Sequence, residues 1–149
     1  MSSIKLELTW PNLRKTGYEI TSQPTPAYNC IAWAAGVTDR PWWPIDQKPY
    51  YWPLEPRIKS LQSFIKAFEQ LGYEICSNSD LEPNLEKVAI YVDEDGEPTH
   101  MARQLTTGQW TSKCGDWEDI SHTLEGLAGE FYGEVSIFMK RPLANQLES

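Results

Sequence analysis

The order of predicted elements indicates a single α+β domain in which a cysteine-bearing helix packs on an antiparallel sheet. Helical patterns fill the first half of the chain and strand patterns the second, and this segregation is typical of α+β folds. The length of 149 residues suits one domain, and the 40% of hydrophobic residues suffice for one core. We therefore assign residues 1–149 to one domain, and we expect residues 143–149 to be a frayed tail.

The N-terminal third contains one short helix. Apolar and polar side chains alternate over residues 4–10, which predicts a half-buried strand or an extended edge segment. Residues 27–35 are small and mostly apolar, Pro26 precedes them and Gly36 follows them. This pattern predicts a short buried helix with a glycine C-cap. Cys30 lies near the start of that helix.

An aromatic loop and a longer helix follow. Residues 41–56 hold five prolines among tryptophans and tyrosines, a density that excludes a helix or a central strand. Apolar side chains then recur every three or four residues over residues 58–71, and Gly72 ends the pattern. This spacing predicts an amphipathic helix.

The second half reads mainly as strands. Residues 88–92 are continuously apolar, which predicts a central strand, and residues 73–76 form a shorter candidate. The segments 100–105 and 109–114 flank a glycine-containing turn and predict a β-hairpin. We expect a short helix over residues 119–127 and a last strand over residues 133–139.

Composition excludes several classes of function. The chain carries 13 Lys and Arg against 21 Asp and Glu, a net charge of −8, so it is acidic and repels nucleic-acid phosphates. It has no apolar run of membrane-spanning length and no signal-peptide pattern, so we expect a cytoplasmic protein without a membrane partner. Three widely spaced cysteines fit neither a disulfide framework nor a zinc cluster. The acidic turn at residues 93–97 lacks the ligand order of a calcium-binding loop.

Cys30 and His100 are the residues that can carry chemistry together. A helix N-terminus favours a thiolate over a thiol, and Cys30 lies near such a terminus. The chain has only two histidines, and His100 begins a predicted strand. A cysteine on a helix that faces a histidine on a strand forms a thiolate–imidazolium pair. His122, by contrast, better suits a capping or surface role, and it is the alternative candidate for the base.

Two segments resemble papain-like hydrolases of the NlpC/P60 and CHAP type. Residues 28–34, Tyr-Asn-Cys-Ile-Ala-Trp-Ala, resemble their nucleophile segment, and residues 99–103, Thr-His-Met-Ala-Arg, resemble their histidine strand. The first of these segments, with Tyr-Trp-Pro at 51–53, His-Met-Ala-Arg-Gln at 100–104 and Trp-Thr-Ser-Lys at 110–113, also resembles an uncharacterised bacterial papain-like family rich in cyanobacterial members. The resemblance implies a papain-like fold of the NlpC/P60 type.

The same resemblance implies a cysteine hydrolase or acyl-transferase that acts on an amide, peptide or thioester bond. Cys30 attacks the carbonyl carbon, and His100 takes the thiol proton and returns it to the leaving group. The Cys30 backbone N–H, with the side chain of Tyr28 or Gln23, stabilises the oxyanion. The expected partner is a peptide, amide or small-molecule substrate, and no metal or organic cofactor is implied.

The residue that orients His100 is predicted from the hairpin register. A two-residue turn at Thr107-Gly108 places His100 opposite Gly115, so the orienting group should come from near that position. Asp116 is the nearest carboxylate and our first candidate, although it could equally cap a following helix. Ser112, Gln104 or a backbone carbonyl are the alternatives.

A different class of function is also open. The fold could be a non-catalytic papain-like binding module that holds a partner with its aromatic loop. Trp42, Trp43 and Trp52 could line a substrate cleft or simply fill the core. Cys76 and Cys114 sit beside apolar neighbours and are expected to be structural.

Overall fold

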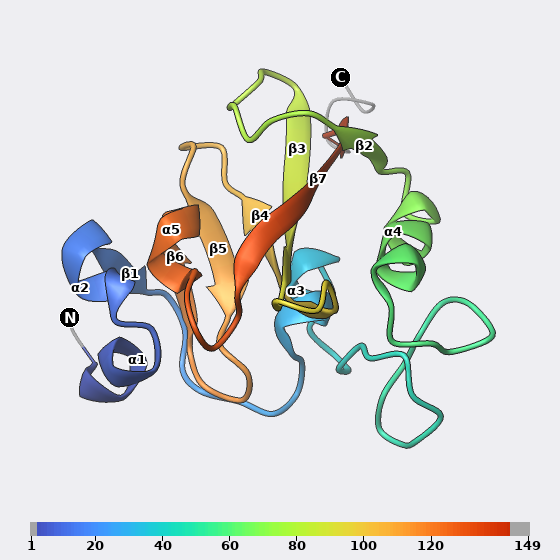
Figure 1. The fold of residues 1–149 in the computed structure, drawn as a ribbon, viewed down its shortest axis with the longest axis horizontal. Helices are drawn as coiled ribbons and strands as arrows, with labels where there is room; N and C mark the ends of the chain where they lie inside the picture. The colour runs from blue at the N-terminus through green and yellow to red at the C-terminus, as the bar shows by residue number, and fades with distance from the viewer. Residues whose placement is uncertain (1–2, 144–149) are drawn as a thin grey trace.

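Within residues 3–143, which the computed structural model describes, seven strands form one antiparallel sheet in the order β1-β6-β5-β4-β3-β7-β2. The mixed α+β class predicted from the sequence is therefore confirmed (Figure 1). The strands are β1 (Tyr18–Ile20), β2 (Glu74–Cys76), β3 (Leu85–Val92), β4 (Pro98–Gln104), β5 (Trp110–Lys113), β6 (Asp119–His122) and β7 (Glu134–Pro142).

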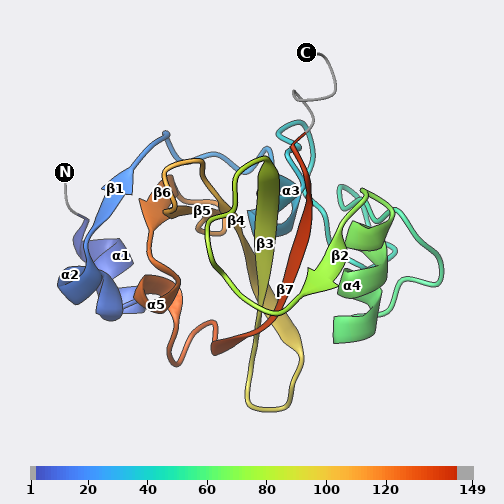
Figure 2. The ribbon, with the colours of Figure 1, turned by 90° about the horizontal axis from the view of Figure 1, so that it is seen from above.

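The helices cover both faces and both ends of this sheet. They are α1 (Ile4–Thr9), α2 (Asn12–Thr16), α3 (Cys30–Ala34), α4 (Leu61–Glu69) and α5 (Leu124–Leu127). Helices α1, α2 and α5 gather beside β1 and β6, whereas α4 lies at the opposite end beside β2 (Figures 1 and 2). Helix α3 packs against β4 and β5.

Alternate side chains of the central strands supply two separate cores. Val88 and Ile90 of β3 pack with helices α3 and α4 in what we call the α3–α4 core. Ala89 and Tyr91 point to the other face and pack with residues of α1, α2 and α5, in the α1–α2–α5 core. The period-2 alternation of a strand thus decides which core each side chain enters.

The predicted strand at residues 4–10 is wrong, because this segment forms helix α1. The side chain of Ser3 accepts a hydrogen bond from the Leu6 N–H and caps the helix. Leu6 and Trp10, four residues apart, are buried, whereas the intervening Leu8 is 77% exposed. The helical spacing of the buried residues outweighs the alternation that the sequence shows.

The predicted helix at residues 119–127 is correct only for its second half. Residues 119–122 form strand β6, and α5 begins after Thr123, whose hydroxyl accepts from the Gly126 N–H. The hairpin of β4 and β5 and the central position of β3 are confirmed. The cysteine helix begins at Cys30, later than the sequence suggested.

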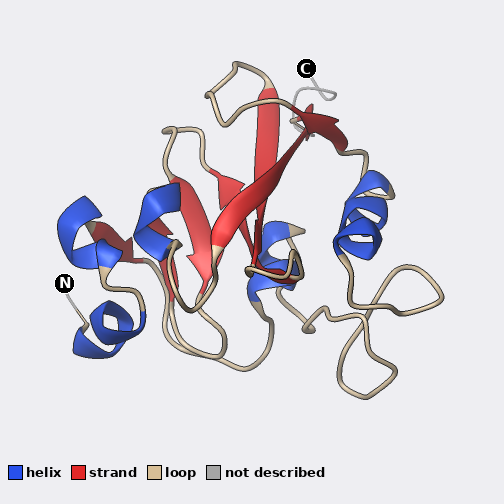
Figure 3. Cartoon of the chain, viewed as in Figure 1, coloured by secondary structure: helices blue, strands red, loops and turns tan. Residues whose placement is uncertain are grey.

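The connection between α3 and α4 is irregular, as the prolines predicted. Figure 3 shows it as one long loop, in which Trp42 and Tyr51 form an isolated bridge. Of the expected tail, residues 144–149 lie outside the described part of the chain.

Gly133 offers a test of how tightly the loop before β7 is held. An added Cβ at Gly133 would clash with the Val92 carbonyl oxygen, whereas Gly96 has nearly the same positive φ and no described atom within 4 Å of such a Cβ. Gly96→Ala should lower the free energy of unfolding by about 1–2 kcal/mol, the strain of a left-handed residue. Gly133→Ala should lower it by clearly more, because the backbone must also move. Urea denaturation of both variants measures this, and equal losses would contradict the contact.

Candidate active site

Cys30 is the first residue of α3, so it lies at the start of a helix as the sequence suggested, although the helix begins later than predicted. Its neighbour Asn29 is the N-cap, and the Asn29 Oδ1 accepts from the Ala32 N–H at 3.1 Å. Cys30 is only 7% exposed and belongs to the α3–α4 core. The helix therefore presents the thiol to the sheet rather than to open solvent.

The Cys30 sulfur lies near the part of β4 that is beyond its described pairing with β5. The described pairing of these strands runs from Gln104–Trp110 to Arg103–Thr111, although β4 continues to Pro98. Because the Leu105 N–H donates to β5, every second N–H along β4 points the same way, including that of Met101. The Met101 N–H is instead the foremost of the backbone groups that lower the pKa of the Cys30 thiol, so it lies near the sulfur.

Burial dominates the protonation of Cys30. It raises the pKa of the thiol to about 11, against the smaller lowering effects of nearby backbone N–H groups and the Lys113 charge. The thiol is therefore protonated at neutral pH. The expected thiolate–imidazolium pair is not the resting state, because removal from water outweighs the helix N-terminus.

His100 is fully buried on β4 and enters the α1–α2–α5 side of the sheet. Its ring stacks on Tyr132 with 3.9 Å between centroids and meets the edge of Tyr91 at 5.3 Å. His100 Nε2 lies 2.9 Å from Ser112 Oγ. The other ring nitrogen, Nδ1, is buried without a hydrogen-bond partner among the described residues. Burial, followed by the proximity of His122, holds the pKa of His100 well below its usual range.

Ser112 also contacts the second histidine. His122 Nε2 lies 2.7 Å from Ser112 Oγ, and His122 Nδ1 lies 2.6 Å from the Thr123 carbonyl oxygen. His122 is 1% exposed, and burial lowers its pKa to about 4. The sequence did not predict this role for His122, and the structure joins both histidines of the chain through one hydroxyl.

Asp116, our first candidate for orienting His100, is not the residue that contacts its ring. Asp116 is exposed in the turn between β5 and β6, whereas Ser112, one of the alternatives, is fully buried against His100 Nε2. Gln104, another alternative, donates its side-chain N–H to the Ser79 carbonyl.

Asp116 was predicted because the expected turn between β4 and β5 is one residue too short. Gln104 pairs with Trp110, so the loop is one residue longer than the expected two-residue turn, and Gly108 adopts a φ of 95° within it. Continuing this register aligns His100 with Cys114 instead of Gly115. A shift of one residue exchanges the two faces of a strand, and it brings Ser112 to the same face as His100.

The two predicted oxyanion-stabilising side chains lie in different surroundings. Tyr28 is buried, and its hydroxyl donates to Asp119 Oδ2 at 2.6 Å. Burial, aided by this hydrogen bond, raises the pKa of Tyr28 to about 12. Gln23 is exposed in the loop before α3, and its role stays a prediction.

Lys113 is an unpredicted neighbour of Cys30 on the same face of the sheet. It is fully buried, and its ammonium donates to the carbonyls of Gly115 at 2.7 Å and Trp117 at 2.5 Å. Its charge lowers the pKa of Cys30 slightly. The one-residue register shift that brings Ser112 to His100 also turns Lys113 toward the cysteine helix.

The aromatic loop docks on the helix that carries Cys30. Asn29 Oδ1 accepts from the Trp42 N–H at 3.0 Å, and Asn29 Nδ2 donates to the Trp42 carbonyl at 2.8 Å. Trp42 and Trp52 are 4% and 3% exposed and pack in the α3–α4 core, so they serve as core residues. Trp43 is half-buried against Phe64, and substrate contact stays a prediction for this residue.

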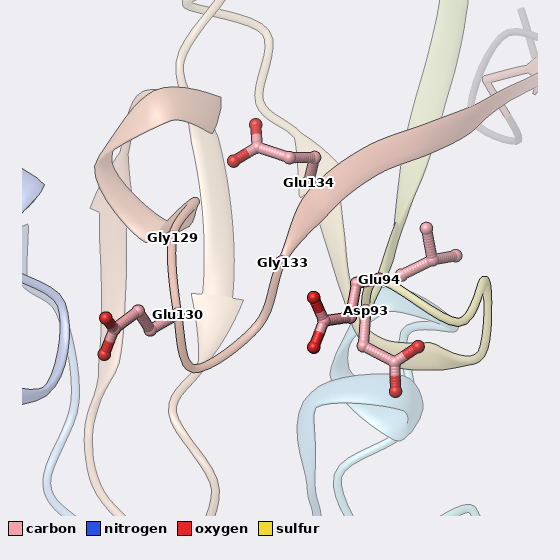
Figure 4. Close-up of a pocket in the computed structure, with 7 residues that line it drawn as sticks. Asp93, Glu94, Gly129, Glu130, Gly133 and Glu134 are labelled. Atoms are coloured by element: carbon pink, nitrogen blue, oxygen red, sulfur yellow. The ribbon is translucent and has the colours of Figure 1, made fainter.

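An acidic pocket adjoins the loop that carries Tyr132 (Figure 4). It has a volume of about 570 Å³ and is lined by Val92, Asp93, Glu94, Gly129, Glu130, Gly133 and Glu134. Its four carboxylates give it a negative potential.

Within residues 3–143, no three or more His, Cys, Asp or Glu side chains are arranged to hold a metal ion. In the same range, no helix has the length and apolar character needed to cross a membrane.

Comparison with known families gives one match. Residues 19–140 match a family model described as a domain of unknown function, DUF7689. Neither the curated proteins nor the solved structures contain a match to this chain. The matched range includes Cys30, His100, Ser112 and His122.

Asn29 should be a major contributor to the stability of the cysteine helix. Asn29→Ala loses the N-cap, worth about 0.5–2 kcal/mol, together with both hydrogen bonds to Trp42. Asn29→Asp keeps the acceptor for Ala32 but loses the donor to the Trp42 carbonyl, so it should cost less. Thermal or urea unfolding of the pair measures the difference, and an Ala variant as stable as the Asp variant would contradict the capping role.

The buried histidines predict a loss of stability on mild acidification. A neutral histidine with a depressed pKa stabilises the fold fully above its unfolded pKa of about 6.5, and that contribution disappears as the pH falls toward the folded value. For His122, whose pKa is about 4, this amounts to about 2 kcal/mol between pH 7 and pH 5. His100 adds to the loss in the same direction.

Urea unfolding at pH 7, 6 and 5 measures this loss above the range in which most carboxylates titrate. The pH dependence should become smaller in the variant His122→Gln, which has no imidazole to protonate at this position. A free energy of unfolding that is constant from pH 7 to pH 5 would show that neither histidine is held neutral by burial.

Proposed function

The chain belongs to the DUF7689 family, and we propose that it is a papain-like cysteine hydrolase or acyl-transferase in which Cys30 is the nucleophile and His100 the general base. The bond attacked is an amide, peptide or thioester bond in a peptide or small-molecule substrate. The order of a cysteine helix followed by a histidine strand of an antiparallel sheet supports the papain-like part of the proposal.

The observation that carries the proposal is the end of the described β4–β5 pairing beside Cys30. Cys30 belongs to one core and His100 packs on Tyr91 in the other, so a continuous ladder would keep them apart. The Cys30 sulfur lies near the backbone N–H of Met101, the residue directly after His100, where no β4–β5 pair is described. His100 Nδ1 is left without a described partner, while Nε2 is held by Ser112. We propose that Cys30 is the partner of Nδ1.

The chemistry follows from two neutral groups. As the Cys30 sulfur bonds to the carbonyl carbon, the thiol proton moves to His100 Nδ1 and the carbonyl oxygen becomes an oxyanion. The Cys30 backbone N–H at the start of α3 stabilises that oxyanion. His100 then gives the proton to the leaving group, which leaves a thioester on Cys30. Water or an acceptor nucleophile, deprotonated by His100, cleaves the thioester and restores the thiol.

Burial favours a second candidate, the non-catalytic papain-like binding module. Cys30 is 7% exposed, and its thiol has a pKa of about 11. In such a module the thiol and the imidazole are packing groups, and a partner contacts the protein through exposed parts of the aromatic loop. The two proposals differ in one respect: only the enzyme requires the reactivity of Cys30 to depend on His100.

Alkylation by iodoacetamide, mapped by mass spectrometry from pH 6 to pH 10, separates the two. The background should be Cys76→Ser, because Cys76 is partly exposed on β2 and would react through accessibility alone. The informative variant is His100→Gln, which keeps a polar atom near Ser112 but has no basic Nδ1.

If His100 is the base, His100→Gln should slow Cys30 alkylation near neutral pH by roughly tenfold or more, since general-base assistance contributes typically 10²–10⁴-fold. Cys114, which is 1% exposed, serves as the internal control and should remain unmodified in both proteins. An unchanged Cys30 rate in a folded His100→Gln variant would reject the enzyme and favour the binding module.

A further inference from the structure

We infer that the hydrogen bonds joining His100, Ser112, His122 and the Thr123 carbonyl run in one direction, and that Ser112 and His122 are positioning residues that hold His100 with Nδ1 unprotonated. The direction rests on the contacts alone. The positioning role rests on the proposed function, because it concerns the base that acts on Cys30.

The contact between His122 and the Thr123 carbonyl determines the direction of this chain of hydrogen bonds. A backbone carbonyl oxygen can only accept, so His122 Nδ1, at 2.6 Å from it, must carry a proton. In a neutral imidazole the other nitrogen is then an acceptor. Burial lowers the pKa of His122 to about 4, so the ring is neutral at pH 7. His122 Nε2 therefore presents a lone pair to Ser112.

The Ser112 hydroxyl therefore also determines which nitrogen of His100 is protonated. It has one proton, which it must donate to His122 Nε2 at 2.7 Å. Toward His100 Nε2, at 2.9 Å, it can only accept, so His100 Nε2 carries the proton. The His100 ring is also neutral, because burial lowers its pKa. Its Nδ1, which is buried without a described partner, is consequently a bare lone pair, as a general base requires.

The surroundings keep these rings in place. His100 lies between Tyr132, stacked at 3.9 Å, and the edge of Tyr91 at 5.3 Å, so its plane is fixed as well as its tautomer. When Nδ1 takes the thiol proton, Nε2–H still donates to Ser112. The chain of hydrogen bonds therefore orients the imidazolium and need not transfer a proton along its length.

Nitrogen-15 NMR of the histidine rings tests the direction. The chain has only two histidines, so the variants His100→Gln and His122→Gln assign every ring signal. At pH 7 the wild-type protein should show His100 as the Nε2–H tautomer and His122 as the Nδ1–H tautomer. Finding His100 as the Nδ1–H tautomer, or as an imidazolium, would overturn the inference.

A matched pair at His122 tests the positioning role. His122→Gln can place its amide oxygen near the position of Nε2 and accept from Ser112, whereas His122→Phe fills the space without an acceptor. Ser112 in the Phe variant is free to donate to His100, so the His100 signals should move toward the Nδ1–H tautomer. Alkylation of Cys30 should slow by roughly tenfold or more in the Phe variant and recover in the Gln variant.

The outcomes separate the two proposals. In one outcome, NMR shows the predicted tautomers but Cys30 alkylation is equally fast in His100→Gln. This result would support the direction of the hydrogen bonds and overturn both the proposed function and the positioning role. In the other outcome, His100 is the Nδ1–H tautomer but Cys30 alkylation slows in His100→Gln. This result would support the proposed function and overturn the inferred direction of the hydrogen bonds. If His122→Phe does not fold, the wild-type NMR spectrum still decides the direction.

Discussion

The register of the β4–β5 hairpin is the constraint on which the candidate site depends. The turn returns the chain so that Gln104 pairs with Trp110, and the described ladder ends one pair later. Because side chains alternate along a strand, this single choice places Ser112 beside His100 and directs Lys113 toward the cysteine helix. Beyond the end of the described ladder, the Met101 N–H lies near the Cys30 sulfur. One residue more or fewer in the turn would exchange these partners.

Burial determines the protonation states of the side chains that the hairpin brings together. The thiol of Cys30 and the rings of His100 and His122 are each almost fully removed from water, and each is neutral for that reason. A standing ion pair is therefore absent from the described site, and proton transfer has to accompany the attack of sulfur on the substrate. The same burial requires the polar atoms to be paired inside the protein, which the Ser112 hydroxyl achieves for both rings at once.

Much of this arrangement could be predicted from the sequence. The apolar spacing before Gly72 located α4, and the continuous apolar run located the central strand β3. The positions of Cys30 on a helix and His100 on a strand followed from a local pattern and from the small number of histidines. These features depend on residues that are near one another in the chain, where periodicity is informative.

The remaining features depend on contacts that local patterns do not specify. Residues 4–10 satisfy both a strand and a helix pattern, and the Ser3 cap with the burial of Leu6 decided for the helix. A one-residue error in the turn was enough to favour Asp116 over Ser112. His122 could have been found, because it follows the apolar Ile120 by two residues and so lies on the same face of a strand.

Reaction with an activated acyl ester, p-nitrophenyl acetate, tests the central claim that Cys30 attacks acyl carbon with the help of His100. We predict one acetyl group per chain, which peptide mapping places on Cys30, and much slower formation and loss of this thioester in a folded His100→Gln variant. Acetyl groups found only on Cys76 or on lysines, or a Cys30 thioester that forms equally fast without His100, would contradict it.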